Sequence, residues 1–177
     1  MGRIWKGLGL KPLWDFLFAS PRRLMGLIAL ACAGLLGFGL YLQHSVGLDP
    51  CPMCVVQRYA FVLVGVAAAL GCAWRARWWQ ALWTVVILAL SGFGAFVAAR
   101  QSWMQWYPPE IASCGRDFYG IVENYPISKA IPMLFRGSGD CTAIDWSFLG
   151  MSIANWSFLM FVGIAAALCV SLLYKRY

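Results

Sequence analysis

The sequence predicts an all-α integral membrane protein, a bundle of four transmembrane helices. Its 177 residues are 62% hydrophobic and only 12% charged, whereas a soluble domain is about 25% charged. Four apolar windows lie at residues 24–43, 55–74, 79–98 and 154–174, and each has the length of about 20 residues that crosses a hydrocarbon core of about 30 Å. Because the runs are continuously apolar, they predict helices and not the alternating strands of a barrel.

The windows differ in charge and in what flanks them. Residues 24–43, 79–98 and 154–174 carry no charged side chain, and 55–74 carries one, Arg58, near its start. A cleaved signal peptide is the competing interpretation of the first window. It is disfavoured because the basic segment before the window is long and no small-x-small cleavage site follows it. We therefore expect one membrane domain spanning residues 1–177, with a cytoplasmic N-terminal segment at 1–23.

Lysine and arginine set the orientation. Nine flank the windows on the side of the termini, and four lie in the loops on the other side. The nine are Arg3, Lys6, Lys11, Arg22, Arg23, Arg75, Arg77, Lys175 and Arg176. Cytoplasmic loops are enriched in positive charge, so we expect cytoplasmic termini and periplasmic loops at 44–54 and 99–153. The same distribution accounts for the net charge of +7 and leaves no basic stripe of the kind that binds nucleic acid.

Four of the seven cysteines fall in the two outer loops, where an oxidising compartment favours disulfides. They are Cys51, Cys54, Cys114 and Cys141. The other three fall in or at the ends of the windows, where a cysteine is usually a small buried apolar residue. These are Cys32, Cys72 and Cys169.

Structural bridges and zinc are the alternatives to a redox role. A bridge within the long loop would remove roughly 3.5 kcal/mol of unfolded-chain entropy, but the short Cys51–Cys54 ring would remove only about 2 kcal/mol. A Cys-x-x-Cys pair at the mouth of a helix suits switching better, because the free amide donors and the helix dipole favour a thiolate. Zinc is disfavoured because the second pair is not a Cys-x-x-Cys, so we expect no metal.

Arg58 favours the redox interpretation of the first pair. It follows Cys54 by one helical turn and so shares its face. An arginine costs about 2.5–3.5 kcal/mol at the centre of a bilayer and less near its edge. Beside Cys54 it could stabilise a thiolate and bond the carbonyl oxygen of an acceptor dissolved in the membrane. The alternative is that Arg58 only extends to the interface.

Three separated motifs give the chain a specific resemblance. They are Gln43–Cys54 (QHSVGLDPCPMC) followed by Gln57-Arg58, Gln105–Pro108 (QWYP) leading to Ala112-Ser113-Cys114, and Gly137–Cys141 (GSGDC) continuing to Trp146–Gly150 (WSFLG). In this order they resemble the disulfide bond formation protein B (DsbB) family of bacterial inner-membrane proteins. The match runs from the first window to the fourth.

The resemblance implies a thiol:quinone oxidoreductase that reoxidises a periplasmic DsbA-like dithiol oxidase. It implies that the partner's thiolate attacks a Cys114–Cys141 disulfide, with the mixed disulfide at Cys114. Cys141 would then attack at Cys51, and Cys54 would leave as a thiolate next to Arg58. Two electrons would pass to a membrane quinone, either ubiquinone or menaquinone.

Two further residues are candidate quinone contacts. His44 is the single histidine and matches a Gln-His pair of the family, although an interfacial polar role fits it equally well. Gln101 departs from the family pattern, because some members have a histidine implicated at the quinone there. Two other functions stay open: a carrier bringing reducing power outward, which would need a cytoplasmic cysteine pair, and a scaffold with two structural disulfides.

Overall fold

Four long helices make up most of the described part of the chain. The computed structural model describes residues 20–47, 51–108, 144 and 146–174. In chain order the elements are helix α2 (Pro21–Ser45), helix α3 (Pro52–Ala73), helix α4 (Arg77–Trp106), strands β1 (Ser147–Phe148) and β2 (Met151–Ser152), and helix α7 (Ile153–Tyr174). All four helices are long and apolar enough to cross a bilayer, which confirms the predicted fold class.

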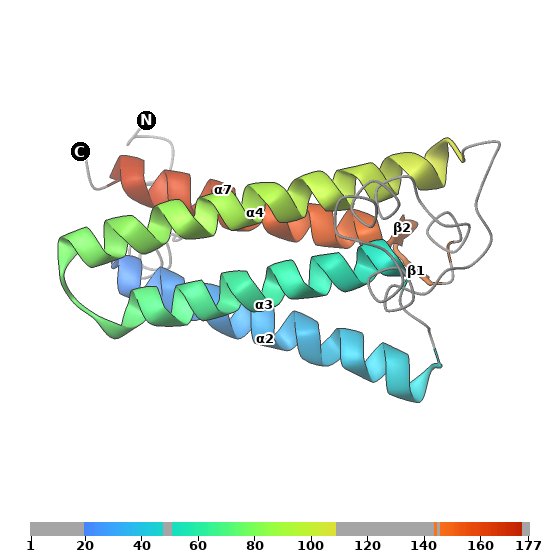
Figure 1. Cartoon of the computed structure of the whole chain (residues 1–177), viewed down its shortest axis with the longest axis horizontal. Helices are drawn as coiled ribbons and strands as arrows, with labels where there is room; N and C mark the ends of the chain where they lie inside the picture. Colours follow the sequence, from blue (N-terminus) through green and yellow to red (C-terminus); the bar gives the residue numbers. More distant parts are fainter. Residues whose placement is uncertain (1–19, 48–50, 109–143, 145, 175–177) are drawn as a thin grey trace, which may run out of the picture.

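The helices form an up-and-down bundle in which each packs beside the next one along the chain (Figure 1). α2 packs on α3, α3 on α4, and α4 on α7, whereas α2 and α7 contact each other little. The start of α2, the α3–α4 turn and the end of α7 lie at one end of the bundle. The hairpin of β1 and β2 lies at the opposite end, beside the start of α3 and the end of α4.

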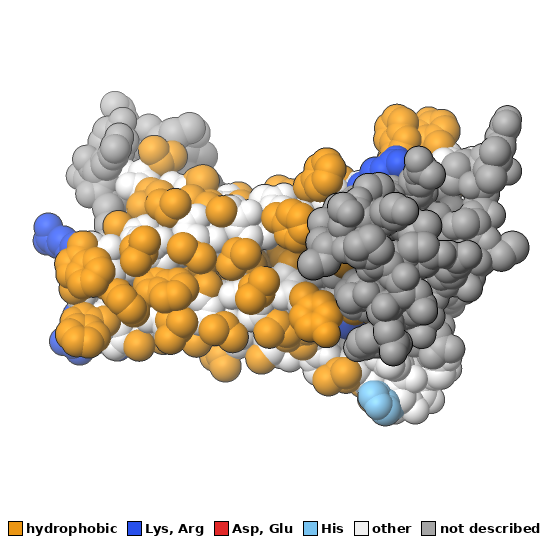
Figure 2. Space-filling model, viewed as in Figure 1, with side chains coloured by type: hydrophobic (Ala, Val, Ile, Leu, Met, Phe, Trp, Pro, Cys, Tyr) orange, Lys and Arg blue, Asp and Glu red, His pale blue; other side chains and the backbone are white. Residues whose placement is uncertain are grey.

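The flank of the bundle is apolar outside as well as inside. Figure 2 shows apolar side chains over most of the length of the bundle, with Lys or Arg side chains at the end with the α3–α4 turn and a few near the opposite end. Large residues such as Leu30 and Val85 are 70% and 66% exposed. A soluble monomer rarely exposes so large a contiguous apolar surface. The surface is that of a protein solvated by lipid.

Side chains from neighbouring helices bond the carbonyl groups that the end of α3 leaves without helical partners. Arg22 Nε donates to the carbonyl oxygen of Cys72 at 2.8 Å, and Trp79 Nε1 donates to that of Leu70 at 2.8 Å. The last four carbonyl groups of a helix have no partner within the helix. These two contacts therefore bind the start of α2 and the start of α4 to the end of α3.

In the middle of the bundle, a glycine on α4 packs against one of a pair of stacked phenylalanine rings. Phe161 on α7 is fully buried, and its ring stacks on that of Phe61 on α3 with the ring centroids 4.0 Å apart. A Cβ atom at Gly94 on α4 would lie 2.5 Å from two atoms of the Phe161 ring. Only glycine at position 94 therefore lets α4 and α7 approach as closely as they do.

All four helices are longer than the apolar windows that predict them, and α2 and α4 exceed their windows most. α4 continues to Trp106, so residues 99–106, which the sequence analysis assigns to a loop, are helical. α2 likewise continues to Ser45, which makes His44 part of a helix. Hydropathy indicates which residues contact lipid. A helix can continue beyond those residues until the backbone leaves the helical conformation. For α4 that point comes just before Pro108, since a proline disfavours the helical region for the residue that precedes it.

We expect Gly94→Ala to destabilise the bundle by about 1–3 kcal/mol, because the added methyl group overlaps a rigid, fully buried ring. Thermal unfolding of the purified protein in detergent, followed by circular dichroism, measures this. Gly92→Ala is the matched control, since a Cβ atom there would meet nothing within 4 Å. Equal unfolding temperatures for the two variants would contradict the close approach of α4 and α7.

Candidate functional site

Cys51 caps the N-terminus of α3 with its sulfur atom. Its backbone is extended (φ −63°, ψ 158°), Pro52 follows at the first helical position, and Cys51 Sγ accepts a hydrogen bond from the backbone N–H of Cys54 at 3.3 Å. This turn brings the two sulfur atoms within 2.7 Å of each other. A disulfide bond is about 2.05 Å long. The pair is therefore placed to form and break a disulfide with little movement of the backbone.

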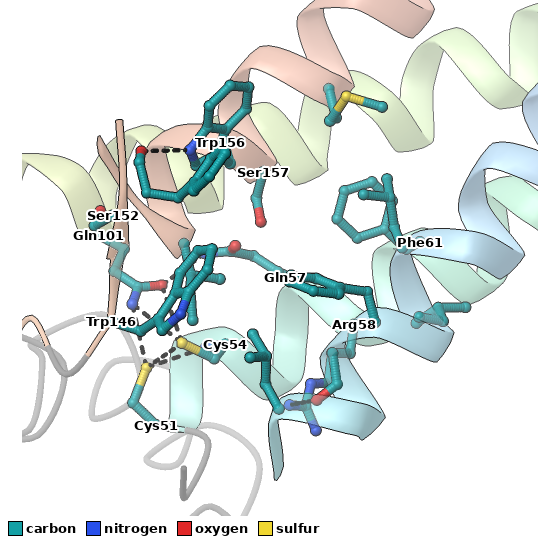
Figure 3. Close-up of a pocket in the computed structure, with 18 of the residues that line it drawn as sticks. Cys51, Cys54, Gln57, Arg58, Phe61, Gln101, Trp146, Ser152, Trp156 and Ser157 are labelled. Carbon is teal, nitrogen blue, oxygen red and sulfur yellow. Dashed lines mark hydrogen bonds between the residues drawn. The ribbon is translucent and has the colours of Figure 1, made fainter. Parts of the chain in front are cut away.

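A buried glutamine on α4 contacts both sulfur atoms (Figure 3). Gln101 Nε2 lies 3.3 Å from Cys51 Sγ and 3.2 Å from Cys54 Sγ. Its Oε1 accepts a hydrogen bond of 2.6 Å from Nε2 of Gln57. Both glutamines are 3% exposed, and buried polar groups need such partners. The helical extension of α4 beyond the apolar window is what carries Gln101 to the cysteines.

The guanidinium of Arg58 extends from α3 to α2. Nη1 donates to Oε1 of Gln43, and Nη2 donates to the carbonyl oxygen of Gly39 at 3.2 Å. A Cβ atom at Gly39 would lie 3.7 Å from Nε of Arg58, so the guanidinium lies close over the α2 backbone there. These bonds hold the charge between two helices. The sequence analysis expects Arg58 beside Cys54; both line one cavity, and the side chain that bonds the Cys54 sulfur is Gln101.

The cysteine pair opens onto an apolar cavity of about 540 Å³. α2 contributes Leu36 and Phe38 to the lining, and α7 contributes Trp156 and Ser157. Phe61 comes from α3, beside the polar side chains of Gln57 and Arg58. The cavity lies at the seam where α2 and α7 contact each other little. Figure 3 shows the labelled polar side chains of the cysteine pair, Gln57, Gln101 and Arg58 on one side of this space.

The β1–β2 hairpin forms the outer wall of the cavity. Leu149 and Gly150 at its turn have φ of 53° and 76°, as a two-residue type I′ turn requires. Trp156 Nε1 donates to the carbonyl oxygen of Phe148 at 3.1 Å. The hydroxyl of Ser152 donates to Oε1 of Gln105 on α4 at 2.6 Å. These bonds hold the hairpin against α7 and α4.

An aromatic contact joins the hairpin end to α2. The ring of Trp146 packs edge-on against that of Phe38, with the centroids 5.9 Å apart, and stacks with that of Phe148 at 6.1 Å. All three rings line the cavity. A flat aromatic ligand could therefore contact rings at its faces and polar donors at its edge.

The predicted site residues fall into three groups. Cys51, Cys54, Arg58 and Gln101 all line the one cavity. His44 lies outside that lining: its side chain is exposed, and Nδ1 is 3.0 Å from the carbonyl oxygen of Leu40, so quinone contact by His44 stays a prediction. The second cysteine pair and the segments at 1–19 and 109–143 lie outside the described residues.

Sequence reasoning missed several residues that build the site. The motif that contains Gln57 gives it no role by itself, although Gln57 follows Cys54 by three positions and so shares its helical face. No sequence pattern indicates that Phe38 and Trp146 line the cavity, because their approach depends on how the end of the hairpin packs against α2. Among the described residues, no group of three or more His, Cys, Asp or Glu side chains could hold a metal ion.

The fold and the site together define a membrane-embedded thiol oxidoreductase, whose Cys-x-x-Cys pair faces a cavity at a lipid-facing seam. Comparison with known proteins agrees. The family model described as disulfide bond formation protein DsbB matches residues 21–171. Disulfide bond formation protein B of Paracidovorax citrulli is 65% identical over 159 residues, which cover 90% of this chain and 91% of that protein. The protein of the same name from Aromatoleum aromaticum is 48% identical over 92% of this chain and 98% of its own length.

The chain belongs to the DsbB family. It is accordingly an oxidoreductase of the bacterial inner membrane that reoxidises DsbA and uses a membrane quinone as the electron acceptor. DsbA, DsbB and quinone together keep the bacterial periplasm oxidising. The predicted family, activity and location are thereby confirmed.

Filling the cavity from α7 should block use of the quinone. We expect Ser157→Trp to raise the apparent KM for a soluble ubiquinone analogue about tenfold or more, because an indole would occupy the space that the ligand needs. The readout is quinone reduction, followed by absorbance with reduced DsbA as the electron donor.

Leu159→Trp is the control for Ser157→Trp, because Leu159 lies on the same helix and is 46% exposed on the flank of the bundle. It should leave the KM unchanged. If both variants weakened quinone use equally, the cavity would not be the quinone site.

Proposed function

We propose that Cys51, Cys54, Arg58 and Gln101 serve the quinone, while Cys114 and Cys141 serve the DsbA-like partner. One observation supports the first half: the Cys51–Cys54 pair lines an apolar cavity together with the side chains of Gln57, Arg58 and Gln101. The second half follows from chemistry, because the partner is aqueous and the acceptor is in lipid. A single cysteine pair could not face both.

The residues of the cavity fit a quinone. A quinone supplies a flat ring whose carbonyl oxygens accept two electrons and two protons. Arg58 has five N–H donors, and two of them bond Gln43 and Gly39. The guanidinium would hold a carbonyl oxygen, Phe61 and Trp156 would contact the ring, and the α2–α7 seam would admit the apolar tail from the bilayer.

The thiol chemistry conserves electrons at every exchange. The thiolate of the partner attacks a Cys114–Cys141 disulfide, so that the partner forms a mixed disulfide at Cys114 and Cys141 becomes a thiolate. The second thiolate of the partner then attacks the mixed disulfide, which releases the partner with its own disulfide and leaves Cys114 as a thiolate. Cys141 then attacks Cys51 Sγ, and the pair of electrons in the Cys51–Cys54 bond leaves on Cys54. The Cys114 thiolate next attacks Cys141 in the Cys51–Cys141 bridge, which re-forms the Cys114–Cys141 disulfide and releases Cys51. Closure of the Cys51–Cys54 disulfide would then pass two electrons and two protons to the quinone, so one partner dithiol is oxidised for each quinone reduced.

We expect Cys54→Ser to abolish quinone reduction by reduced DsbA, because the Cys51–Cys54 disulfide could then neither open nor close. The assay uses purified protein in detergent with a soluble ubiquinone analogue, and a menaquinone analogue alongside it. Reduction that survives the loss of Cys54 would overturn its assignment. No reduction by the unaltered protein, with both disulfides intact throughout, would favour a structural scaffold.

Cys114→Ser should separate the two halves of the reaction. Loss of the attacked sulfur should prevent the mixed disulfide with DsbA, as judged by non-reducing electrophoresis. Quinone reduction driven by a small dithiol should persist, because such a reductant reaches the Cys51–Cys54 pair without the protein partner. Loss of both activities to the same extent would contradict the division of labour.

A further inference from the structure

We propose that Gln57 and Gln101 form an oriented pair of amides that stabilises the thiolate released when the Cys51–Cys54 disulfide opens. Gln101 is the residue that contacts the reacting sulfur atoms, and Gln57 acts through it as a positioning residue. The inference rests on the proposed use of the Cys51–Cys54 pair and adds the groups that control its ionisation.

The distances give the direction of the amide. Gln101 Nε2 donates to Cys54 Sγ at 3.2 Å, and the Cys54 thiol donates to Oε1 of Gln101 over a longer distance of 3.7 Å. The thiolate has no proton to donate, so only the contact with Nε2 serves it. Nε2 is also 3.3 Å from Cys51 Sγ. An amide nitrogen carries two N–H donors, so one group can serve both sulfur atoms.

Gln57 prevents the amide of Gln101 from turning over. Nε2 of Gln57 donates to Oε1 of Gln101 at 2.6 Å, and both side chains are buried from solvent. With Gln57 in its present orientation, reversal of the Gln101 amide would bring two NH2 groups face to face and an oxygen toward the sulfur atoms. A buried donor left without an acceptor is costly. The hydrogen bond from Gln57 therefore keeps the donors of Gln101 directed at the cysteines.

This arrangement matters when Cys141 attacks Cys51. As that bond forms, the Cys51–Cys54 bond breaks and Cys54 takes the electron pair as a thiolate. A leaving thiol that ionises more readily leaves faster. Donors fixed where negative charge develops stabilise it without reorganising during the reaction. Among the described residues that line the cavity, Arg58 is the only charged side chain and Cys51 is the only titratable group besides Cys54. The amide pair thus supplies donors without adding a second charge.

The test measures ionisation of Cys54 without partner or quinone. The reduced protein, with Cys114→Ser and Cys141→Ser in the background, is alkylated with iodoacetamide in detergent across a range of pH. Mass spectrometry follows modification at Cys54. Because only the thiolate reacts, the pH at which the rate rises reports ionisation, and the limiting rate at alkaline pH reports access.

We expect Gln101→Met, which keeps the length but removes the donors, to slow alkylation about tenfold at pH 7 and leave the limiting rate unchanged. Gln57→Met should have a smaller effect. Gln101→Asn, which withdraws the amide by one methylene, is the second variant if Gln101→Met does not fold.

Gln105→Met is the matched control. Gln105 lines the same cavity one turn further along α4, and its side chain bonds Ser152. This variant should leave the alkylation curve in place. An unmoved curve in the Gln101 variants, or an equal displacement in Gln105→Met, would overturn the inference. Neither result bears on the proposed function, which would fail instead if quinone reduction were absent while the alkylation curves moved as expected.

Discussion

The contact between the first turn of α3 and the outer part of α4 is the interaction on which the site depends. Cys51 caps α3, which folds the Cys-x-x-Cys segment so that the two sulfur atoms approach each other. Gln101 then meets both sulfur atoms from α4. Neither helix alone would build this arrangement. The cap fixes the cysteines relative to α3, and the length of α4 determines which side chain they meet.

The bilayer explains why the polar groups lie where they do. Lipid offers no hydrogen bonds, so polar side chains within a membrane bundle must find partners inside the protein. Gln57 and Gln101 bond each other, and Arg58 bonds Gln43 and Gly39 on α2. These pairings hold the outer ends of α2, α3 and α4 together, and the same groups form the polar side of the cavity. The side chains of Gln57, Gln101 and Arg58 thus both connect the helices and line the cavity.

Uneven packing around the bundle creates the cavity. Where α4 meets α7, Gly94 permits a close approach under Phe161. At the α2–α7 seam the helices contact each other little, and the hairpin aromatics Trp146 and Phe148 close the outer side. A cavity at this seam can receive an apolar molecule from the membrane, while the cysteines remain at the periplasmic end of α3. The enzyme can thereby join an aqueous donor to a lipid acceptor.

The sequence alone predicted the four helices, which the structure confirms, and it predicted their orientation and a redox role for the Cys51–Cys54 pair. These properties are local: a helix must be apolar over the thickness of the bilayer, and a Cys-x-x-Cys pair lies within one turn. Residue spacing also placed Arg58 on the face of Cys54. The ends of α2 and α4 were missed, because hydropathy reports the limit of the lipid and not the limit of the helix.

Only the tertiary structure decided which residues surround the sulfur atoms. Gln101 lies 47 residues from Cys54, and its approach depends on the rotation and the length of α4 relative to α3. The role of Gln57 becomes visible only once Gln101 is in place. The cavity, likewise, is a property of how four helices and a hairpin pack, because its volume is whatever the packed side chains leave unfilled. Side-chain pairings between helices depend on such distances in space, and no spacing along the chain specifies them.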